Sequence, residues 1–252
     1  MTEMATYPSL RDRTVLVTGG GSGIGAAIVS HFAGQGARVG FLDIDIAAST
    51  ALKADLGPAA VHFEPCDLRD IPALRAAIAA VAAALGPITI LVNNAAHDAR
   101  HRLEDVTPEY WDERYAVNLR HQFFAAQAVA PGMMAAGGGV IINLGSNSWM
   151  QARGGMPAYT SAKSAVVGLT RALARDLGAQ GIRVLSVVPG WIMTERQIAL
   201  HLTPEGEAEL MANQCVKRKL TPDDIARPIL FFASEEAAAC AMQSYVIDGG
   251  WV

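Results

Sequence analysis

The chain has 252 residues, 51% of them hydrophobic and 17% charged, which suits one large folded domain and argues against disorder. Its net charge of −4 argues against nucleic acid as the main partner. Three scattered cysteines, Cys66, Cys215 and Cys240, form no CxxC spacing and cannot all pair. This usage favours a reducing, cytoplasmic setting.

Neither a membrane span nor a metal site is expected. The alanine-rich stretch 73–85 contains Arg75 and is too short to cross a bilayer, and Met1 to Leu10 lacks an apolar core suited to secretion. His97 and His101 are four residues apart, but no cysteine or carboxylate set completes a zinc site.

Strand and helix patterns alternate along the chain. Most of the strand patterns are nearly continuous, β-branched apolar runs, as expected for parallel strands covered on both faces. The expected strands are residues 15–18, 39–43, 61–66, 88–93, 140–144, 184–188 and 245–247. Helices are expected to begin near Ile24, Ile46, Ile71, Pro108, Pro157 and Pro222.

This alternation predicts an α/β fold, a single doubly wound (Rossmann) domain over residues 1–252. Its seven-stranded parallel sheet would carry helices on both faces. Residues 191–219 interrupt the rhythm after the sixth strand. Ligands of such folds bind beyond the carboxyl ends of the strands, so we expect this segment to cover the substrate.

A glycine-rich turn follows the first strand. Thr18-Gly19-Gly20-Gly21-Ser22-Gly23-Ile24-Gly25 lies between an apolar run and a helix-like stretch. A turn in that context lets the backbone approach a phosphate, with the helix N-terminus facing the negative charge. The sequence therefore predicts a dinucleotide site here.

Asp43 closes the second strand, where a carboxylate can hold both ribose hydroxyls of an adenosine. A 2′-phosphate there would meet a like charge, at a cost of about 4 kcal/mol at ~4 Å with an effective dielectric of ~20. The glycine turn contains no lysine or arginine to offset that cost, so NAD is expected rather than NADP. Asp45 is an alternative contact.

Tyr159 and Lys163 are four residues apart and share one face if the stretch is helical. An ammonium beside a phenol favours the phenolate, which predicts a lowered tyrosine pKa and a role as general acid and base. Taken alone, the pair also fits a surface tyrosine beside a solvated lysine. Ser146 lies thirteen residues upstream of the tyrosine.

The joint pattern resembles the short-chain dehydrogenase/reductase family over the whole chain. It combines the glycine turn, Asn93-Asn94-Ala95-Ala96, Ser146, the Tyr159–Lys163 pair and the run from Pro189 to Thr194. The family commonly shows glycine where this chain has Ala96.

The resemblance implies a role for each matching residue. Ser146 would hydrogen-bond the reacting oxygen, and Tyr159 would transfer its proton. Lys163 would lower the pKa of the phenol and hold the nicotinamide ribose, and Asn118 would anchor a water chain to solvent. The implied cofactor-binding set is Gly19, Ser22, Gly23, Ile24, Gly25, Asp43, Asp67, Leu68, Asn94, Tyr159, Lys163, Pro189, Gly190, Ile192 and Thr194.

A narrower resemblance, to bacterial NAD-dependent aldose (D-xylose) 1-dehydrogenases, covers residues 7–10, 110–118, 130–133 and 203–208. It implies oxidation of a free sugar at the anomeric carbon to a lactone. Asn147 and Trp149 follow Ser146 and are candidate sugar contacts. The family usually forms homotetramers.

Two other functions fit the same residues. One is an NAD(P)-dependent reductase of a ketone such as a 3-oxoacyl thioester, which would use the same catalytic core. The other is a non-catalytic protein that binds NAD. Such a protein would tolerate losing Ser146, Tyr159 or Lys163, yet all three are present.

Overall fold

A computed structural model describes residues 5–57 and 61–252. Met1 to Met4, part of the N-terminal stretch considered for secretion, lie outside the described residues.

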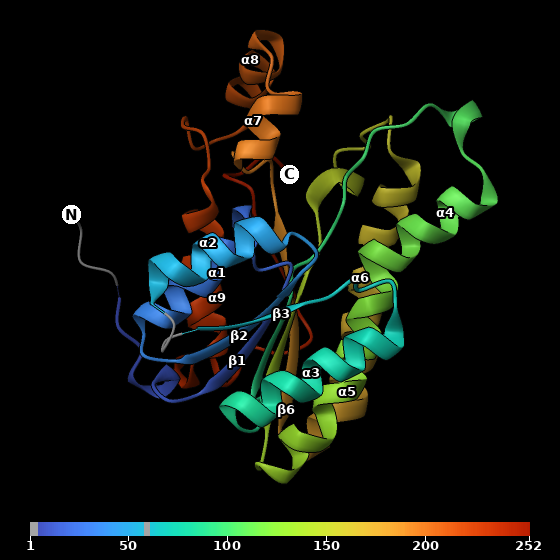
Figure 1. The fold of residues 1–252 in the computed structure, drawn as a ribbon. Helices are drawn as coiled ribbons and strands as arrows, with labels where there is room; N and C mark the ends of the chain where they lie inside the picture. The colour runs from blue at the N-terminus through green and yellow to red at the C-terminus, as the bar shows by residue number, and fades with distance from the viewer. Residues whose placement is uncertain (1–4, 58–60) are drawn as a thin grey trace.

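The core of the molecule is a seven-stranded, all-parallel sheet with strand order β3-β2-β1-β4-β5-β6-β7 (Figure 1), which confirms the predicted fold class. Central strand β1 pairs with both β2 and β4, so that Val15 lies between Val39 and Ile90. The fourth strand begins at Ile90, two residues later than expected. The strands are β1 Thr14–Thr18, β2 Arg38–Asp43, β3 Val61–Pro65, β4 Ile90–Asn93, β5 Gly139–Leu144, β6 Ile182–Pro189 and β7 Ser244–Ile247.

Helices cover both faces of this sheet (Figure 1). Side chains of successive strand residues point to opposite faces, so Val15 and Val17 pack in one core and Leu16 in the other. The first core is closed by α1 Gly23–Gly34, α2 Ile46–Leu56 and α9 Pro222–Ala233. The second is closed by α3 Ile71–Leu85, α5 His121–Ala135 and α6 Pro157–Leu177.

The expected helix starts are largely confirmed. Local capping side chains explain why the helices begin at these residues. The Thr107 hydroxyl accepts a hydrogen bond from the backbone N–H of Tyr110 at the start of α4 Pro108–Tyr115. Thr221 and Asp224 form a reciprocal capping box at the start of α9. The sequence did not reveal the π-helical turn Ala116–Arg120, which joins α4 directly to α5.

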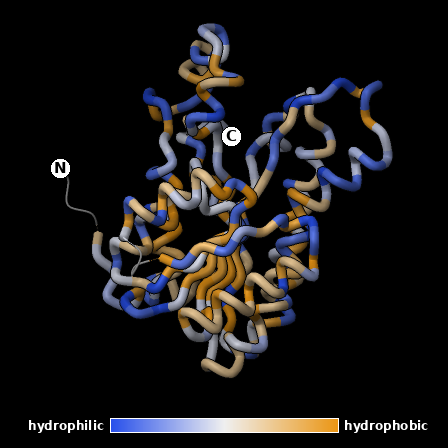
Figure 2. Tube along the Cα trace, viewed as in Figure 1, coloured by the Kyte–Doolittle hydropathy of each residue, from blue (hydrophilic) through white to orange (hydrophobic). Residues whose placement is uncertain are grey.

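Residues 191–219 rise above the carboxyl ends of the strands (Figure 1) and contain two helices that the sequence did not predict. These are α7 Glu195–His201 and α8 Pro204–Asn213. Figure 2 shows hydrophobic strands at the centre and many hydrophilic residues in the segments above them. Short 3-10 turns lie at Pro8–Leu10, Leu103–Asp105, Asn147–Trp149, Gly178–Gln180 and Glu235–Ala237.

Candidate active site

Loops from the carboxyl ends of the strands enclose a cavity of about 670 Å³, within the usual range for a ligand pocket. Every residue of the expected cofactor-binding set lines it, as do Ser146 and Asn147. Asn118 and Trp149 are not part of its lining. The fold thus brings together residues that are scattered from Gly19 to Thr194 in the sequence.

The glycine turn is packed so closely that side chains would not fit. A Cβ on Gly25 would lie 1.8 Å from the carbonyl oxygen of Gly19, and one on Gly19 would lie 2.7 Å from Cα of Ala95. The side-chain amide of Asn94 donates to that same Gly19 oxygen at 2.8 Å. The bare backbone at the start of α1 therefore fits the phosphates of a dinucleotide.

Asp43 and Asp45 differ in what they contact. A carboxylate oxygen of Asp43 accepts a hydrogen bond from the backbone N–H of Gly21 at 2.8 Å, and Asp43 lines the cavity. Asp45 is the N-cap of α2, where its carboxylate accepts from Ala48 N at 3.0 Å. This geometry favours Asp43 over Asp45 as the contact for a ribose.

Asp67 and Leu68 form another part of the lining, beyond β3. The Arg69 guanidinium binds the Asp67 carboxylate and holds the pKa of that carboxyl below its usual range. Opposite them, Ile192 and Thr194 follow β6, and the Thr194 hydroxyl accepts from Gln197 N at the start of α7. A Cβ on Gly23 would lie 3.0 Å from the Thr194 methyl group, so the glycine turn and α7 are in contact.

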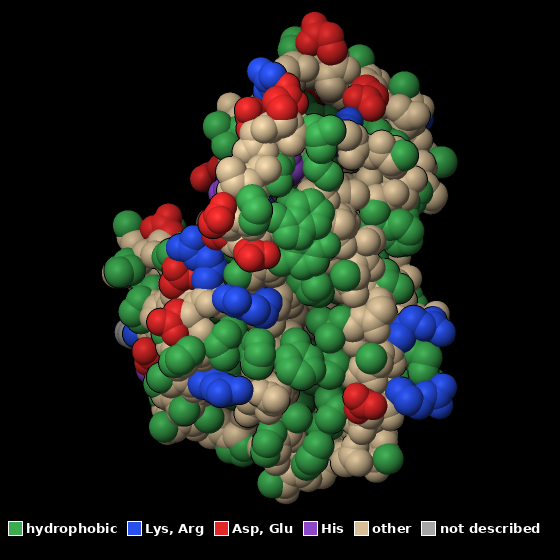
Figure 3. Space-filling model, turned by 90° about the vertical axis from the view of Figure 1, so that its right-hand side faces the viewer, with side chains coloured by type: hydrophobic (Ala, Val, Ile, Leu, Met, Phe, Trp, Pro, Cys, Tyr) green, Lys and Arg blue, Asp and Glu red, His purple; other side chains and the backbone are tan. Residues whose placement is uncertain are grey.

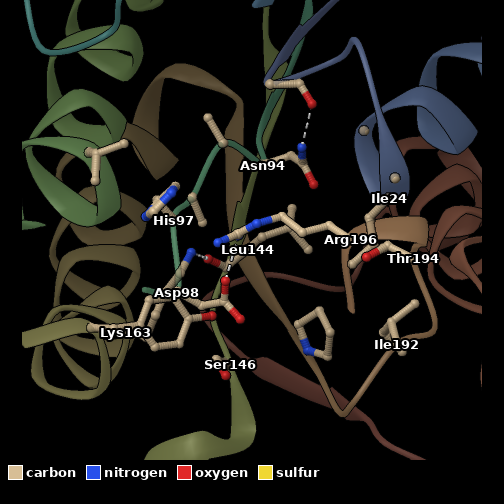
Figure 4. A pocket seen from close by; sticks show the side chains of 18 of the residues that line it. Ile24, Asn94, His97, Asp98, Leu144, Ser146, Lys163, Ile192, Thr194 and Arg196 are labelled. Atoms are coloured by element: carbon tan, nitrogen blue, oxygen red, sulfur yellow. Dashed lines mark hydrogen bonds and ion pairs between the residues drawn. The ribbon is translucent and has the colours of Figure 1, made fainter. Parts of the chain in front are cut away.

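The three expected catalytic side chains meet at the end of β5. Ser146 follows the strand, and Tyr159 and Lys163 come from the first turns of α6. Nζ of Lys163 is buried, donates to the Leu144 carbonyl at 2.8 Å and lies 6.0 Å from the centre of the Tyr159 ring. Figure 4 shows Ser146 and Lys163 on the same side of the pocket.

The predicted lowering of the Tyr159 pKa is wrong for this arrangement. Burial raises the pKa of Tyr159 to about 12, although a hydrogen bond with Ser146 acts in the opposite direction. Burial also lowers the pKa of Lys163 to about 7. A full lysine charge was expected beside the phenol, but burial disfavours the charged form of both groups.

Asn118 lies in the π-helical turn and is fully buried. Its side-chain oxygen accepts from His97 N at 2.9 Å, and its amide donates to the carbonyls of Arg114 and His97. It therefore fastens the loop that follows β4. Its role as anchor of a water chain stays a prediction.

The two candidate sugar contacts are placed differently. The Asn147 amide lines the cavity but donates to a carboxylate oxygen of Asp248 at 3.1 Å. Trp149 is 36% exposed and lies outside the lining, so the geometry does not support it as a substrate contact. The polar turn after Ser146 was a correct guide to the cavity, but it did not show which side chains face inward.

Asp98 and Arg153, polar residues expected near the pocket, line the cavity. Three further lining residues, Arg196, Gln197 and Trp251, were not named from the sequence. Trp251 carried no sequence signal, because only the packing of the C-terminal tail brings it to the cavity. Within residues 5–57 and 61–252, no cluster of three His, Cys, Asp or Glu is placed to hold a metal ion.

Comparisons with known proteins agree with this geometry. The family model described as enoyl-(acyl carrier protein) reductase matches residues 19–252. D-xylose 1-dehydrogenase of Caulobacter vibrioides is 49% identical over 249 residues, which cover 98% of each chain. A probable galactose dehydrogenase of Rhizobium meliloti is 52% identical over 248 residues, or 97% of this chain and 96% of the relative.

Solved structures of dehydrogenases share the fold of this chain. A short-chain type dehydrogenase/reductase from Mycobacterium ulcerans has a TM-score of 0.91 at 27% identity and covers 98% of this chain and 91% of its own. A 7α-hydroxysteroid dehydrogenase in complex with NADH and a 7-oxo bile acid has a TM-score of 0.90 at 32% identity and 96% coverage of each.

A doubly wound fold with a dinucleotide turn and a Ser–Tyr–Lys centre defines an oxidoreductase that uses a nicotinamide cofactor. The chain belongs to the short-chain dehydrogenase/reductase family.

Proposed function

We propose that the protein is an NAD-dependent aldose 1-dehydrogenase, which oxidises the C1 hydroxyl of a sugar to the aldonolactone. The observation that carries this proposal is the meeting of Ser146, Tyr159 and Lys163 at one cavity with the glycine turn. Relatives about half identical over nearly the full length are named as xylose and galactose dehydrogenases.

In the proposed reaction, the C1–H and O–H bonds of the sugar break and the carbonyl of the lactone forms. The nicotinamide ring supplies the acceptor for the hydride when the cofactor is bound. Ser146 donates a hydrogen bond to the sugar oxygen and orients it, and Tyr159 takes the hydroxyl proton. Ser146 and Tyr159 line the same pocket.

Lys163 is the neighbouring group whose charge changes near neutral pH, because burial lowers its pKa to about 7. A protonated Lys163 stabilises the phenolate of Tyr159, which burial otherwise disfavours.

The position of Asp43 supports NAD rather than NADP. Its carboxylate lies against the glycine turn, where a 2′-phosphate would bring a second negative charge. Along the turn itself, residues 18–25 include no basic side chain that would bind that phosphate.

We also propose a cytoplasmic homotetramer in which residues 191–219 cover the substrate. Hydrophobic side chains gather on the face formed by α4 to α6 (Figure 3), and Trp111, Phe123 and Met134 are exposed on α4 and α5. Such a patch favours contact between subunits. Light scattering tests the assembly, and a monomer would contradict it.

In residues 5–57 and 61–252, no helix is long and apolar enough to cross a membrane.

A substrate panel tests the activity. Purified protein is incubated with NAD or NADP and a set of pentoses, hexoses, secondary alcohols and 3-oxoacyl thioesters, and nicotinamide absorbance is followed at 340 nm. We expect reduction of NAD with aldoses. Tyr159→Phe should lower turnover at least ~100-fold while NADH binding persists. Activity confined to ketones or thioesters, with no aldose oxidised, would reject the proposal.

A further inference from the structure

Asp98 is a carboxylate that the proposed chemistry does not use, although it lines the cavity beside the catalytic groups. Its side chain is only 15% exposed. Asp98 lies on the loop after β4, and Figure 4 shows the Arg196 side chain extending toward it in the pocket that also contains Ser146. Burial raises the pKa of Tyr159, and the charge of Asp98 contributes in the same direction.

Two donors from α7 hold the Asp98 carboxylate. Arg196 reaches across the pocket and donates to one oxygen at 2.6 Å, and Gln197 donates to the other at 2.8 Å (Figure 4). The oxygen of the Gln197 amide accepts from the Trp191 indole at 2.9 Å. These contacts hold the pKa of Asp98 below its usual value despite burial, so the carboxylate is charged at neutral pH.

A carboxylate offers about four acceptor positions on its two oxygens. Among the described residues, side chains occupy one position on each oxygen of Asp98. The remaining positions are available to donors in the cavity, and the hydroxyl groups of a sugar are donors. An apolar substrate at the same place would remove water from a charged group without replacing its hydrogen bonds.

We propose that Asp98 is a specificity-determining residue, whose carboxylate accepts a hydrogen bond from a sugar hydroxyl other than the one at C1. This inference rests on the proposed function, which it deepens by naming the group that recognises a polyhydroxylated substrate. Arg196 and Gln197 are positioning residues that keep the carboxylate ionised and aimed into the cavity.

A double-mutant cycle between enzyme and substrate tests this inference. kcat/KM is measured for an aldose and its 2-, 3- and 4-deoxy analogues, with the wild-type protein and Asp98→Asn. We expect at least one deoxy analogue to be ~10-fold or more poorer than the parent sugar for the wild type. In Asp98→Asn that difference should shrink to within ~3-fold, because the amide keeps only one acceptor oxygen and has no charge to strengthen the hydrogen bond from the recognised hydroxyl.

Two further variants separate recognition from a purely structural role. Arg196→Met removes one of the two donors to Asp98, but Gln197 still holds the carboxylate, so the deoxy penalty should persist. Asp55→Asn makes the same chemical change on the exposed surface of α2 and should leave every ratio unchanged. Thermal melting and NADH titration confirm that each variant is folded.

The outcomes are distinguishable. If the wild type oxidises no aldose, the proposed function fails and the inference fails with it. If aldoses are oxidised but Asp98→Asn keeps all deoxy penalties, the inference alone is overturned. An equal loss on every analogue in both Asp98→Asn and Arg196→Met would also overturn it, because Asp98 would then only fasten α7.

Discussion

Single residues near the cavity take their properties from what they contact. Two neighbouring carboxylates, Asp43 and Asp45, look alike in the sequence, yet one lies against the glycine turn and the other caps a helix. Tyr159 and Lys163 are spaced as expected, but burial raises the pKa of Tyr159 and lowers that of Lys163, so that both neutral forms are favoured. Spacing was therefore a good guide to position and a poor guide to ionisation.

The choice of cofactor can be tested at one residue. Replacement of Asp43 by alanine removes the negative charge that a 2′-phosphate would meet. We expect the ratio of kcat/KM for NAD to that for NADP to fall at least ~10-fold, which corresponds to about 1.4 kcal/mol of the repulsion.

Asp45→Ala is the matched control. It removes the N-cap of α2, at a cost of about 1 kcal/mol in the free energy of unfolding, and should leave the cofactor ratio unchanged. A cofactor ratio that moves in Asp45→Ala and stays constant in Asp43→Ala would reverse the assignment.

At the scale of elements, the strands and most helix starts follow from local rules. The apolar runs form the buried strands, and Thr-Pro pairs begin α4 and α9. The π-helical turn before α5 and helices α7 and α8 were not predicted. Helices α7 and α8 are short, and they bury no side chain in α7 and only Leu210 in α8, so they lack a strong apolar pattern.

The first turn of α1 provides a test at this scale. Gly25→Ala would place a methyl group 1.8 Å from the Gly19 carbonyl oxygen, so the turn must move. We expect the free energy of unfolding to fall by about 1–3 kcal/mol and NADH affinity to fall at least ~10-fold.

Gly34→Ala is the control within the same helix, since a Cβ there meets nothing within 4 Å. That variant should melt at the same temperature as the wild type or higher, with NADH affinity unchanged. Unaltered NADH titration in Gly25→Ala would show that the close packing of the turn does not serve the cofactor.

For the molecule as a whole, folding buries a histidine that the unfolded chain would protonate in mild acid. His121, the first residue of α5, is fully buried, and its ring nitrogen contacts the Ala95 carbonyl at 3.2 Å. Burial, with a smaller contribution from the charge of Lys163, lowers its pKa from 6.5 to about 3. The folded protein therefore holds this histidine neutral where the unfolded chain would protonate it.

This difference predicts acid sensitivity. As pH falls from about 6.5 toward 3, the unfolded chain binds a proton that the folded chain does not. The free energy of unfolding therefore falls by up to about 1.4 kcal/mol for each pH unit below about 6.5, down to about pH 3. Above pH 6.5 both states hold His121 neutral and no stability is lost. His121→Gln, which cannot titrate, should flatten the dependence of melting temperature on pH between 6.5 and 4. Identical slopes for variant and wild type would contradict this assignment.

The sequence by itself determined the parallel α/β architecture, the glycine turn and the places of Ser146, Tyr159 and Lys163, since apolar periodicity and short motifs are local properties. Only the tertiary structure decided the burial of Tyr159 and Lys163, the position of Trp149 outside the cavity lining and the pairing of Asp98 with Arg196. Those two residues are 98 positions apart, and the burial and contacts that set their chemistry exist only once distant loops are packed around one cavity.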